Sequence, residues 1–275
     1  MKKMIRWSAL IALLLLLTSP WWGEFLGLDA YSISPDHAYA APSWDHWLGT
    51  DELGRDVLAR VLFGGRISVS VALISSLLAG LLGTGVGLGA GFIGGWADSL
   101  AMRITDIMAA LPRLPVMLVL LMVDEAHFGA QNPAMVRLIV VMTLFGWMNI
   151  ARLARSTALE IQNTSYVTAA RALGTRPSKI VLTHILPNAL VPVSVATSIT
   201  VSQAIIYENV ISFLGLGISP PTPSWGGLLN QGLTYVHEAP LLVLIPGGLT
   251  FLFVLAAHFF SQELRLALDP RVPAR

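Results

Sequence analysis

Ionisable residues inside apolar segments are the first candidates for chemistry in this chain. Arg113 and Glu208 each stand in such a segment, where a charge is costly unless it is paired or faces water. Pro112 and Pro115 lie beside Arg113, and prolines kink a helix and free carbonyl groups around them. We therefore expect Arg113 to line a polar cavity or to pair with a residue of another helix such as Glu208, with snorkelling to the membrane surface as the alternative.

Other side chains indicate an ion pair, a metal site or an ordinary polar turn. Arg103 and Asp106 are three residues apart, so they share one face of a helix and can pair with each other. His46 with Asp51 and Glu52 permits a metal site, but a solvated acidic turn is the more common structure for such a stretch. The six histidines are scattered without ligand spacing, so we expect no bound metal.

Several kinds of chemistry are excluded by what the sequence lacks. Cysteine is absent, which excludes disulfides and thiolate sites. No G-x4-G-K-[ST] phosphate loop is present, so the chain is not expected to hold ATP or any other cofactor. No nucleophile stands beside a base, and no block of like charge indicates a nucleic-acid partner. We expect a protein that is not an enzyme.

A polar stretch between two apolar segments, Tyr166 to Asn188, predicts a loop with structure of its own. Apolar residues at positions 166, 169, 170 and 173 form one stripe of an amphipathic helix. Gly174 ends that helix, because glycine adopts the left-handed conformation without steric cost. Thr175 then caps a second short helix with Pro177 in its first turn. Such an elbow of two short helices is suited to docking a partner outside the membrane, or to lying on anionic lipid.

The elements that position these residues are expected to be membrane-spanning helices. The chain is 55% hydrophobic and 12% charged, whereas a soluble domain carries about 25% charged residues. Apolar windows of about 20 residues are long enough to cross the bilayer. They predict six spans, at about 7–22, 67–93, 101–123, 134–153, 188–212 and 240–261. The fold class is therefore all-α and polytopic.

The distribution of basic residues predicts the orientation. Twelve lie on the side of the N-terminus and the elbow, against four on the other side. The twelve are Lys2, Lys3, Arg6, Arg103, Arg152, Arg155, Arg171, Arg176, Lys179, Arg265, Arg271 and Arg275. The positive-inside rule then places both termini and the elbow in the cytoplasm, with the segments 24–66 and 213–239 facing outward.

Small residues predict where the second span packs. Gly83, Gly87 and Gly91 recur at every fourth position, and small residues let membrane helices approach closely. We expect this face to contact protein, either within the chain or in a partner.

The outward segments are expected to hold two further structures. Thr50 or Asp51 can cap a helix that starts with Glu52. The run from Ile211 to Leu229 is rich in glycine and proline, which favours extended backbone. Such backbone is tolerated near the membrane where it faces protein or water, so we expect the mouth of a pathway there.

The elbow resembles the EAA loop of the membrane subunits of bacterial ABC importers. The matching residues are Ala169, Ala170, Gly174, Leu186 and Pro187. Thr168 stands where that loop has Glu, and His184 before I-L-P-N is similar to the peptide and nickel branch. The stretches LGTDELGRDVLARVLFGGRIS and ISFLGLGISPPTPSWGGLL, with the tail LALDPR, closely resemble the "C" type permease subunits for dipeptides, oligopeptides and nickel.

This resemblance to the binding-protein-dependent transport inner membrane components implies a type I ABC importer transmembrane domain. The expected parts are an N-terminal helix at 1–25, an extracytoplasmic segment at 26–66, a permease core at 67–265 with a coupling loop at 154–187, and a tail at 266–275. The resemblance assigns docking of the ATPase to Ala169, Ala170, Gly174, Thr175, Arg176, Leu186 and Pro187. Candidates for the pathway and its mouth are Arg113, Glu208, Pro220, Pro221 and Trp225.

The resemblance also implies partners and a location. The partners are a paralogous permease subunit, two cytoplasmic ATPase subunits that bind ATP and Mg²⁺, an extracytoplasmic substrate-binding protein, and membrane lipid. The location is the bacterial cytoplasmic (inner) membrane. Short peptides are the expected substrate, and nickel or a nickel chelate is the alternative. A stand-alone secondary transporter is the alternative from another class, but the docking elbow and the lack of an evident inverted repeat argue against it.

Overall fold

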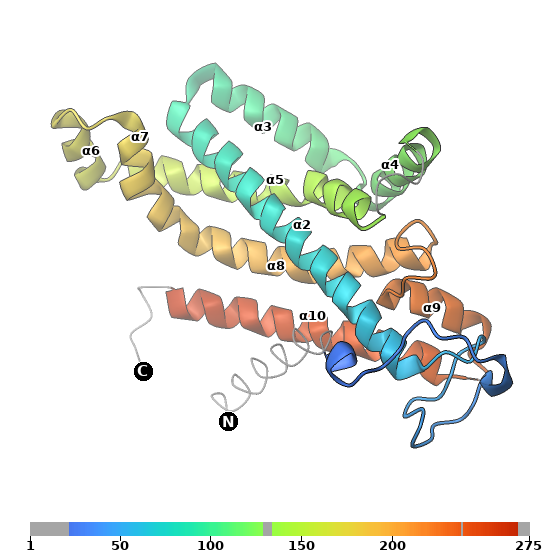
Figure 1. Cartoon of the computed structure of the whole chain (residues 1–275). Helices are drawn as coiled ribbons and strands as arrows, with labels where there is room; N and C mark the ends of the chain where they lie inside the picture. Colours follow the sequence, from blue (N-terminus) through green and yellow to red (C-terminus); the bar gives the residue numbers. More distant parts are fainter. Residues whose placement is uncertain (1–21, 129–133, 238, 269–275) are drawn as a thin grey trace.

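The computed structural model describes residues 22–128, 134–237 and 239–268, and these form a bundle of long helices without a β-strand (Figure 1). The predicted all-α class is therefore confirmed. The helices are α2 (Val57–Ile93), α3 (Gly95–Ala110), α4 (Arg113–Phe128), α5 (Ala134–Gln162), α6 (Ser165–Ala172), α7 (Pro177–Ile180), α8 (Leu186–Phe213), α9 (Trp225–Thr234) and α10 (Leu241–Leu268). A short 3₁₀ helix, η1 (Pro35–His37), and a π-helical turn, η3 (Val181–Ile185), complete them.

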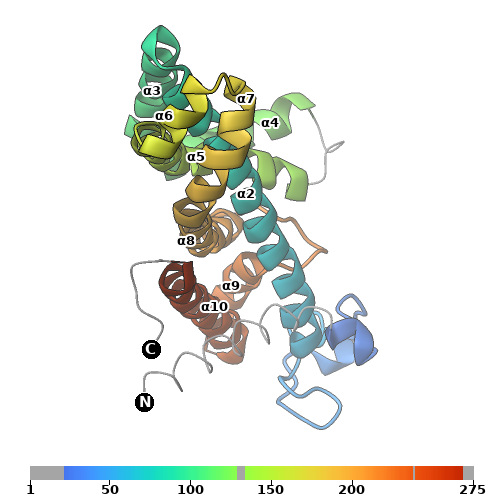
Figure 2. The same cartoon turned by 90° about the vertical axis from the view of Figure 1, so that its left-hand side faces the viewer.

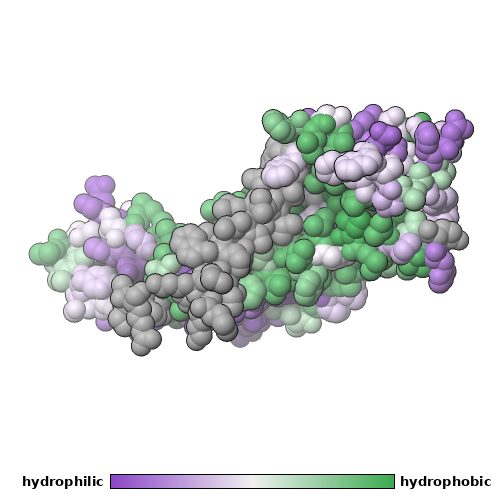
Figure 3. Space-filling view, turned by 90° about the horizontal axis from the view of Figure 1, so that it is seen from below, coloured by the Kyte–Doolittle hydropathy of each residue, from purple (hydrophilic) through white to green (hydrophobic). Residues whose placement is uncertain are grey.

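Four helical runs in the described residues are long and apolar enough to cross a membrane. They are α2, α5, the continuous run from α7 through η3 and α8, and α10. The first predicted span, 7–22, lies outside the described residues except for Trp22. On the face seen in Figure 3, apolar residues fill much of the middle of the molecule and hydrophilic ones gather toward its two ends.

The span expected at 101–123 is not one continuous helix, because two helices replace it. α3 and α4 are bent by 90° at a short break and qualify as a span only as a pair. Leu111 has the extended backbone (φ −69°, ψ 139°) that a following proline imposes, and α4 begins at Arg113, directly after Pro112. The predicted proline kink is thus a complete break in the helix.

The glycine face of α2 packs against α5, which confirms the expected contact and locates it within the chain. A Cβ atom at Gly83 would stand 2.5 Å from the carbonyl oxygen of Trp147, and one at Gly87 would be closer still to that of Ala151. At Gly91 the nearest atom would be the Arg155 carbonyl oxygen at 2.9 Å. The two backbones therefore approach as closely as small residues allow.

The helix expected to start at Glu52 begins five residues later, at Val57, and continues without a break through the span expected at 67–93 as α2. Its cap is neither Thr50 nor Asp51 but Asp56, whose side chain accepts a hydrogen bond from the backbone N–H of Ala59 at 2.8 Å. Asp51 instead closes a turn by accepting from the backbone N–H groups of Leu53 and Arg55. Gly54 within that turn has φ +70°, which no right-handed helix contains.

The two ends of the bundle carry different structures (Figures 1 and 2). α6 and α7 lie at one end, where α10 also finishes, and the segment 22–56 lies at the other end with α9. The helix α9 was not expected from sequence. The expected loop is right for residues 214–224 and wrong beyond Ser224, whose side chain caps α9 by accepting from the N–H of Gly227 at 3.1 Å.

Candidate functional site

The elbow forms at the predicted place, with α6 as its first short helix. The predicted second short helix is wrong, because α7 continues through η3 into α8 as one helical run, Pro177–Phe213. α6 ends in a Schellman arrangement: Gly174 donates to the Arg171 carbonyl at 3.0 Å, and Thr175 donates to the Ala170 carbonyl at 3.1 Å. Gly174 has φ +75°, so its left-handed role is confirmed. The predicted Thr175 cap is wrong by one residue, because Arg176 is the N-cap of α7 and Pro177 takes the first helical position.

The predicted apolar stripe of the elbow faces away from the bundle. Leu173 is 86% exposed, and Tyr166 and Ala169 are also exposed, while Ala170 is half-buried. Val167 on the opposite face is fully buried and anchors α6 in a core cluster with residues of α2, α5 and α8. Leu173 and Ala169 therefore stand exposed at the end of the molecule, whereas Ala170 packs on the core cluster and the ring of Tyr166 lies 5.8 Å from that of His184.

Polar contacts fix the elbow to the helices beside it. The Arg171 guanidinium donates to Gln162 Oε1 at 3.0 Å, and Gln162 Nε2 donates to the Gly91 carbonyl at 2.8 Å. Arg171 also lies 5.8 Å from the ring centre of Phe92. Leu186 and Pro187, the last residues of the predicted docking set, lie in the first turn of α8, which continues from α7 through η3.

A cavity lies between α2, α4, α5 and α8, with about 300 Å³ of empty space counting the part open to solvent. Arg113 lines it, as one of the sequence-based alternatives predicted. Its other lining residues are Ser75, Ser76, Met117, Met142, Phe145, Gly146, Thr200, Gln203, Ala204 and Tyr207. Sequence reasoning missed the polar members. The signal was present, because Thr200, Gln203 and Tyr207 recur on one face of an apolar helix.

Glu208 does not pair with Arg113 within the described part of the chain. Its side chain is fully buried, and its Oε1 accepts a hydrogen bond from Ser212 Oγ at 2.8 Å. The hydroxyls of Ser68 and Ser224 also interact with this carboxyl group. Glu208 therefore joins α8 to α2 and to the loop before α9.

The other mouth candidates divide between surface and core. Pro220 and Pro221 are exposed. Trp225 is 1% exposed and packs edge-to-face on Phe253, with its Nε1 donating to the Val61 carbonyl at 2.9 Å. Its backbone N–H donates to Ser68 Oγ at 3.1 Å. The loop and α9 are thereby held on the first turns of α2.

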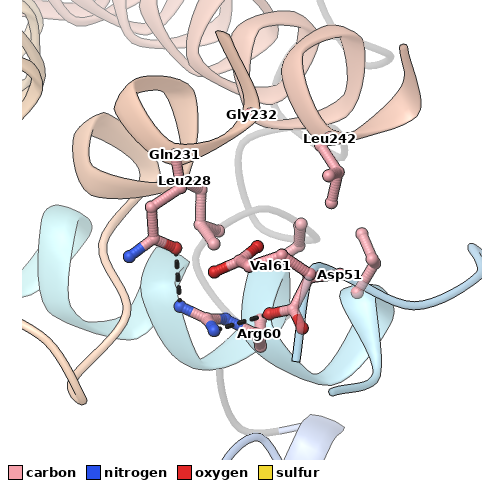
Figure 4. Close-up of a pocket in the computed structure, with 9 residues that line it drawn as sticks. Asp51, Arg60, Val61, Leu228, Gln231, Gly232 and Leu242 are labelled. Atoms are coloured by element: carbon pink, nitrogen blue, oxygen red, sulfur yellow. Dashed lines mark hydrogen bonds and ion pairs between the residues drawn. The ribbon is translucent and has the colours of Figure 1, made fainter. Parts of the chain in front are cut away.

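The acidic turn at Asp51 is not solvated as expected but forms a buried ion network (Figure 4). Asp51 Oδ2 accepts from Arg55 Nε and from Arg60 Nη1, both at 2.7 Å. Arg60 Nη2 donates to Gln231 of α9 at 3.0 Å, and Arg55 Nη2 donates to Glu52 at 2.9 Å. The network closes one side of a small pocket whose other side is apolar.

The basic residues near the elbow end also pair differently from the sequence-based expectation. Asp106 pairs with Arg152 at 2.8 Å and not with Arg103, because α3 lies against α5 at that point. Asp98 binds Arg155 through two contacts of 2.5 and 2.6 Å. Both pairs join α3 to α5, and none of their four residues lines the cavity.

Comparison with known proteins gives a consistent result. Residues 83–272 match the family model described as "Binding-protein-dependent transport system inner membrane component". The oligopeptide transport system permease protein OppC of Bacillus subtilis is 38% identical over 84% of this chain and 73% of its own length. The glutathione transport system permease protein GsiD of Pectobacterium atrosepticum is 35% identical over 96% of this chain and 86% of its own.

A solved structure supports the fold. A chain from an inward-facing conformation of the MetNI methionine ABC transporter has a TM-score of 0.64 at 20% identity, covering 76% of this chain and 96% of that one. The matched family region contains the elbow, the cavity lining of α5 and α8, and all of α10. On these grounds the chain belongs to the binding-protein-dependent transport system inner membrane components, the permease subunits of ABC importers.

Proposed function

We propose that this permease forms, with a paralogous subunit, the pathway for short peptides across the bacterial cytoplasmic membrane. The relatives named for oligopeptides and for glutathione, itself a peptide, support this substrate class. They give no support to nickel, and the family gives none to a stand-alone secondary transporter. The observation that carries the proposal is the elbow, a fixed structure that leaves Leu173 86% exposed and Ala169 exposed.

The elbow docks a cytoplasmic ATPase subunit in this proposal. Leu173 and Ala169 offer apolar contact area, and Arg176 adds a charged group at the rim, the composition typical of protein interfaces. The full docking set is Ala169, Ala170, Gly174, Thr175, Arg176, Leu186 and Pro187. The ATPase subunits bind ATP and Mg²⁺ and hydrolyse the nucleotide, while this chain supplies the mechanical link.

The remaining partners and the orientation follow the same scheme. An extracytoplasmic binding protein delivers the peptide to the end that carries α9 and segment 22–56. The elbow and both termini face the cytoplasm, as the excess of basic residues on that side favours. Arg113, Glu208, Pro220, Pro221 and Trp225 are assigned to the pathway and its mouth, with Glu208 and Trp225 holding its shape and Arg113 lining it.

Substitution at Gly174 tests the docking. Valine is β-branched and resists φ +75°, so Gly174→Val should reshape the elbow and abolish peptide uptake by the reconstituted complex while the chain still inserts. Asparagine tolerates the left-handed conformation, so Gly174→Asn should retain most uptake. A Cβ at Gly174 meets no atom within 4 Å beyond its chain neighbours, so the effect comes from the local backbone conformation and not from a clash with another helix. Normal peptide uptake by the Gly174→Val variant would contradict the docking assignment.

A further inference from the structure

The cavity beside the break between α3 and α4 is lined by a cation that has no partner among the described residues. Arg113 is half-buried there, and no described residue forms a hydrogen bond or ion pair with its guanidinium group. Ser75 and Ser76, which line the same cavity, lie midway along α2. The cation is therefore placed at the depth of the middle of a membrane-spanning helix, where an uncompensated charge is costly.

The backbone adds positive potential at the same place. α4 begins at Arg113, and its first hydrogen bond runs from the N–H of Val116 to the Pro112 carbonyl at 3.2 Å. The N–H groups of Arg113 and Leu114 precede that bond, so they lie at the positive end of the helix dipole. A helix that starts inside a membrane next to a cavity is a known means of stabilising an anion.

A buried hydroxyl provides an independent observation. Ser76 is 1% exposed and lines the cavity, yet its Oγ has no hydrogen-bond partner in the described structure. A buried polar group without a partner is unfavourable unless something else binds it. Gln203 and Tyr207 offer further polar atoms on the α8 side, and Met117, Met142 and Phe145 complete an apolar wall.

We propose that this cavity is a substrate subsite in which Arg113 binds an anionic group, the terminal carboxylate of the transported peptide. The guanidinium group and a carboxylate form charge-assisted hydrogen bonds. Ser76, Gln203 and Tyr207 bind polar groups of the peptide backbone, and the methionine side chains adapt to different residues. The choice of a peptide carboxylate as the anion rests on the proposed function; a lipid phosphate has the same chemistry and is distinguished below.

A two-by-two binding experiment tests the contact. The complex of this chain with its paralogous subunit and ATPase subunits, without the binding protein, is placed in nanodiscs of zwitterionic lipid. Equilibrium dialysis then measures the affinities of radiolabelled trialanine and trialanine amide for the unaltered complex and for Arg113→Gln. Arg103→Gln, an exposed position on α3 outside the cavity, is the matched control.

Amidation and Arg113→Gln should each weaken binding about 10- to 100-fold, the loss expected for one charge-assisted interaction. Applied together they should weaken it no further, because each removes the same contact. Arg113→Lys should retain part of the affinity, and Arg103→Gln all of it. Three results would overturn the subsite. The losses of affinity from amidation and from Arg113→Gln could add, the unaltered complex could bind trialanine amide as tightly as trialanine, or it could fail to bind trialanine.

Two more measurements distinguish a peptide site from a lipid site, and failure of the subsite from failure of the proposed function. If added phosphatidylglycerol displaces trialanine, and retention of that lipid requires Arg113, the site is a lipid phosphate site and the carboxylate assignment fails. Peptide uptake into proteoliposomes with the binding protein present is measured in parallel. Absent uptake by the unaltered complex contradicts the proposed function itself, whereas normal uptake with additive binding losses contradicts the subsite alone.

Discussion

Removal of the Asp51 carboxylate gives a sharp test of the buried ion network that holds segment 22–56. Its Oδ2 atom accepts hydrogen bonds from both Arg55 and Arg60, and all three side chains are buried. Asp51→Ala leaves two buried guanidinium groups without their shared anion. Breaking a buried ion pair costs about 3–5 kcal/mol. Because Glu52 and Gln231 still bind the arginines, we expect about 3 kcal/mol, near the lower value.

Hydrogen exchange measured by mass spectrometry on the assembled complex reports this loss locally. A decrease of about 3 kcal/mol in the free energy of local opening accelerates exchange roughly 100-fold, since about 1.4 kcal/mol is a factor of ten. We expect that acceleration in residues 49–60 and none in the buried middle of α5.

Glu52→Ala is the control for the same measurement. Glu52 is partly exposed and makes one contact with Arg55, so its loss should accelerate exchange less than about tenfold. Equal acceleration by the two variants, or unchanged exchange in Asp51→Ala, would refute the conclusion that Asp51 is the centre of the network.

Two further predictions concern the contacts of α5. Gly87→Ala places a Cβ against the Ala151 carbonyl oxygen, whereas a Cβ at Gly89 meets no atom within 4 Å. Overpacking of this kind costs about 1–3 kcal/mol. Gly87→Ala should therefore lower the Tm of the complex, and the control variant Gly89→Ala should not. Asp98→Asn should weaken the attachment of α3 to α5 by about 1 kcal/mol, since the pair is partly exposed. Limited proteolysis of α3 measures this loss of attachment. The double variant Asp98→Arg with Arg155→Asp should restore the resistance of α3 to proteolysis. Failure of the double variant to do so would contradict the ion pair.

Local rules predicted the elements whose own residues decide their conformation. The positive φ of Gly174 follows from the stereochemistry of one residue, so the sequence was sufficient for it. The prolines predicted the place of the disturbance at Pro112, but as a kink and not as the complete break that the structure has. Ion partners were mispredicted because they come from distant positions. Gln231 binds an arginine 171 residues away, and Asp106 meets Arg152 across two helices. Neighbours in sequence were therefore the wrong guide for Asp106, although they do pair in the turn where Arg55 binds Asp51 and Glu52.

The two sequence stretches that resemble the permease family form a structural contact, and they therefore indicate the family more clearly than the substrate. The stretches 48–68 and 211–229 lie far apart in sequence but pack together in the structure. A Cβ at Gly64 would stand 3.2 Å from the Ser224 backbone, and one at Gly65 would stand 2.9 Å from the Trp225 ring. These residues determine how α2 meets the loop and α9, so any permease with this joint needs them whatever it carries.

The residues that line the cavity lie outside both stretches and outside the elbow. A substrate contacts Arg113, Gln203 or Tyr207 only if it enters that cavity. If the proposed subsite is right, selection among substrates acts on those positions and leaves the contact between the two stretches unchanged. The substrate must accordingly be inferred from the cation, hydroxyls and methionines of the cavity. Arg113 is the residue among them that demands an anion, because its charge is placed in the membrane without a described partner.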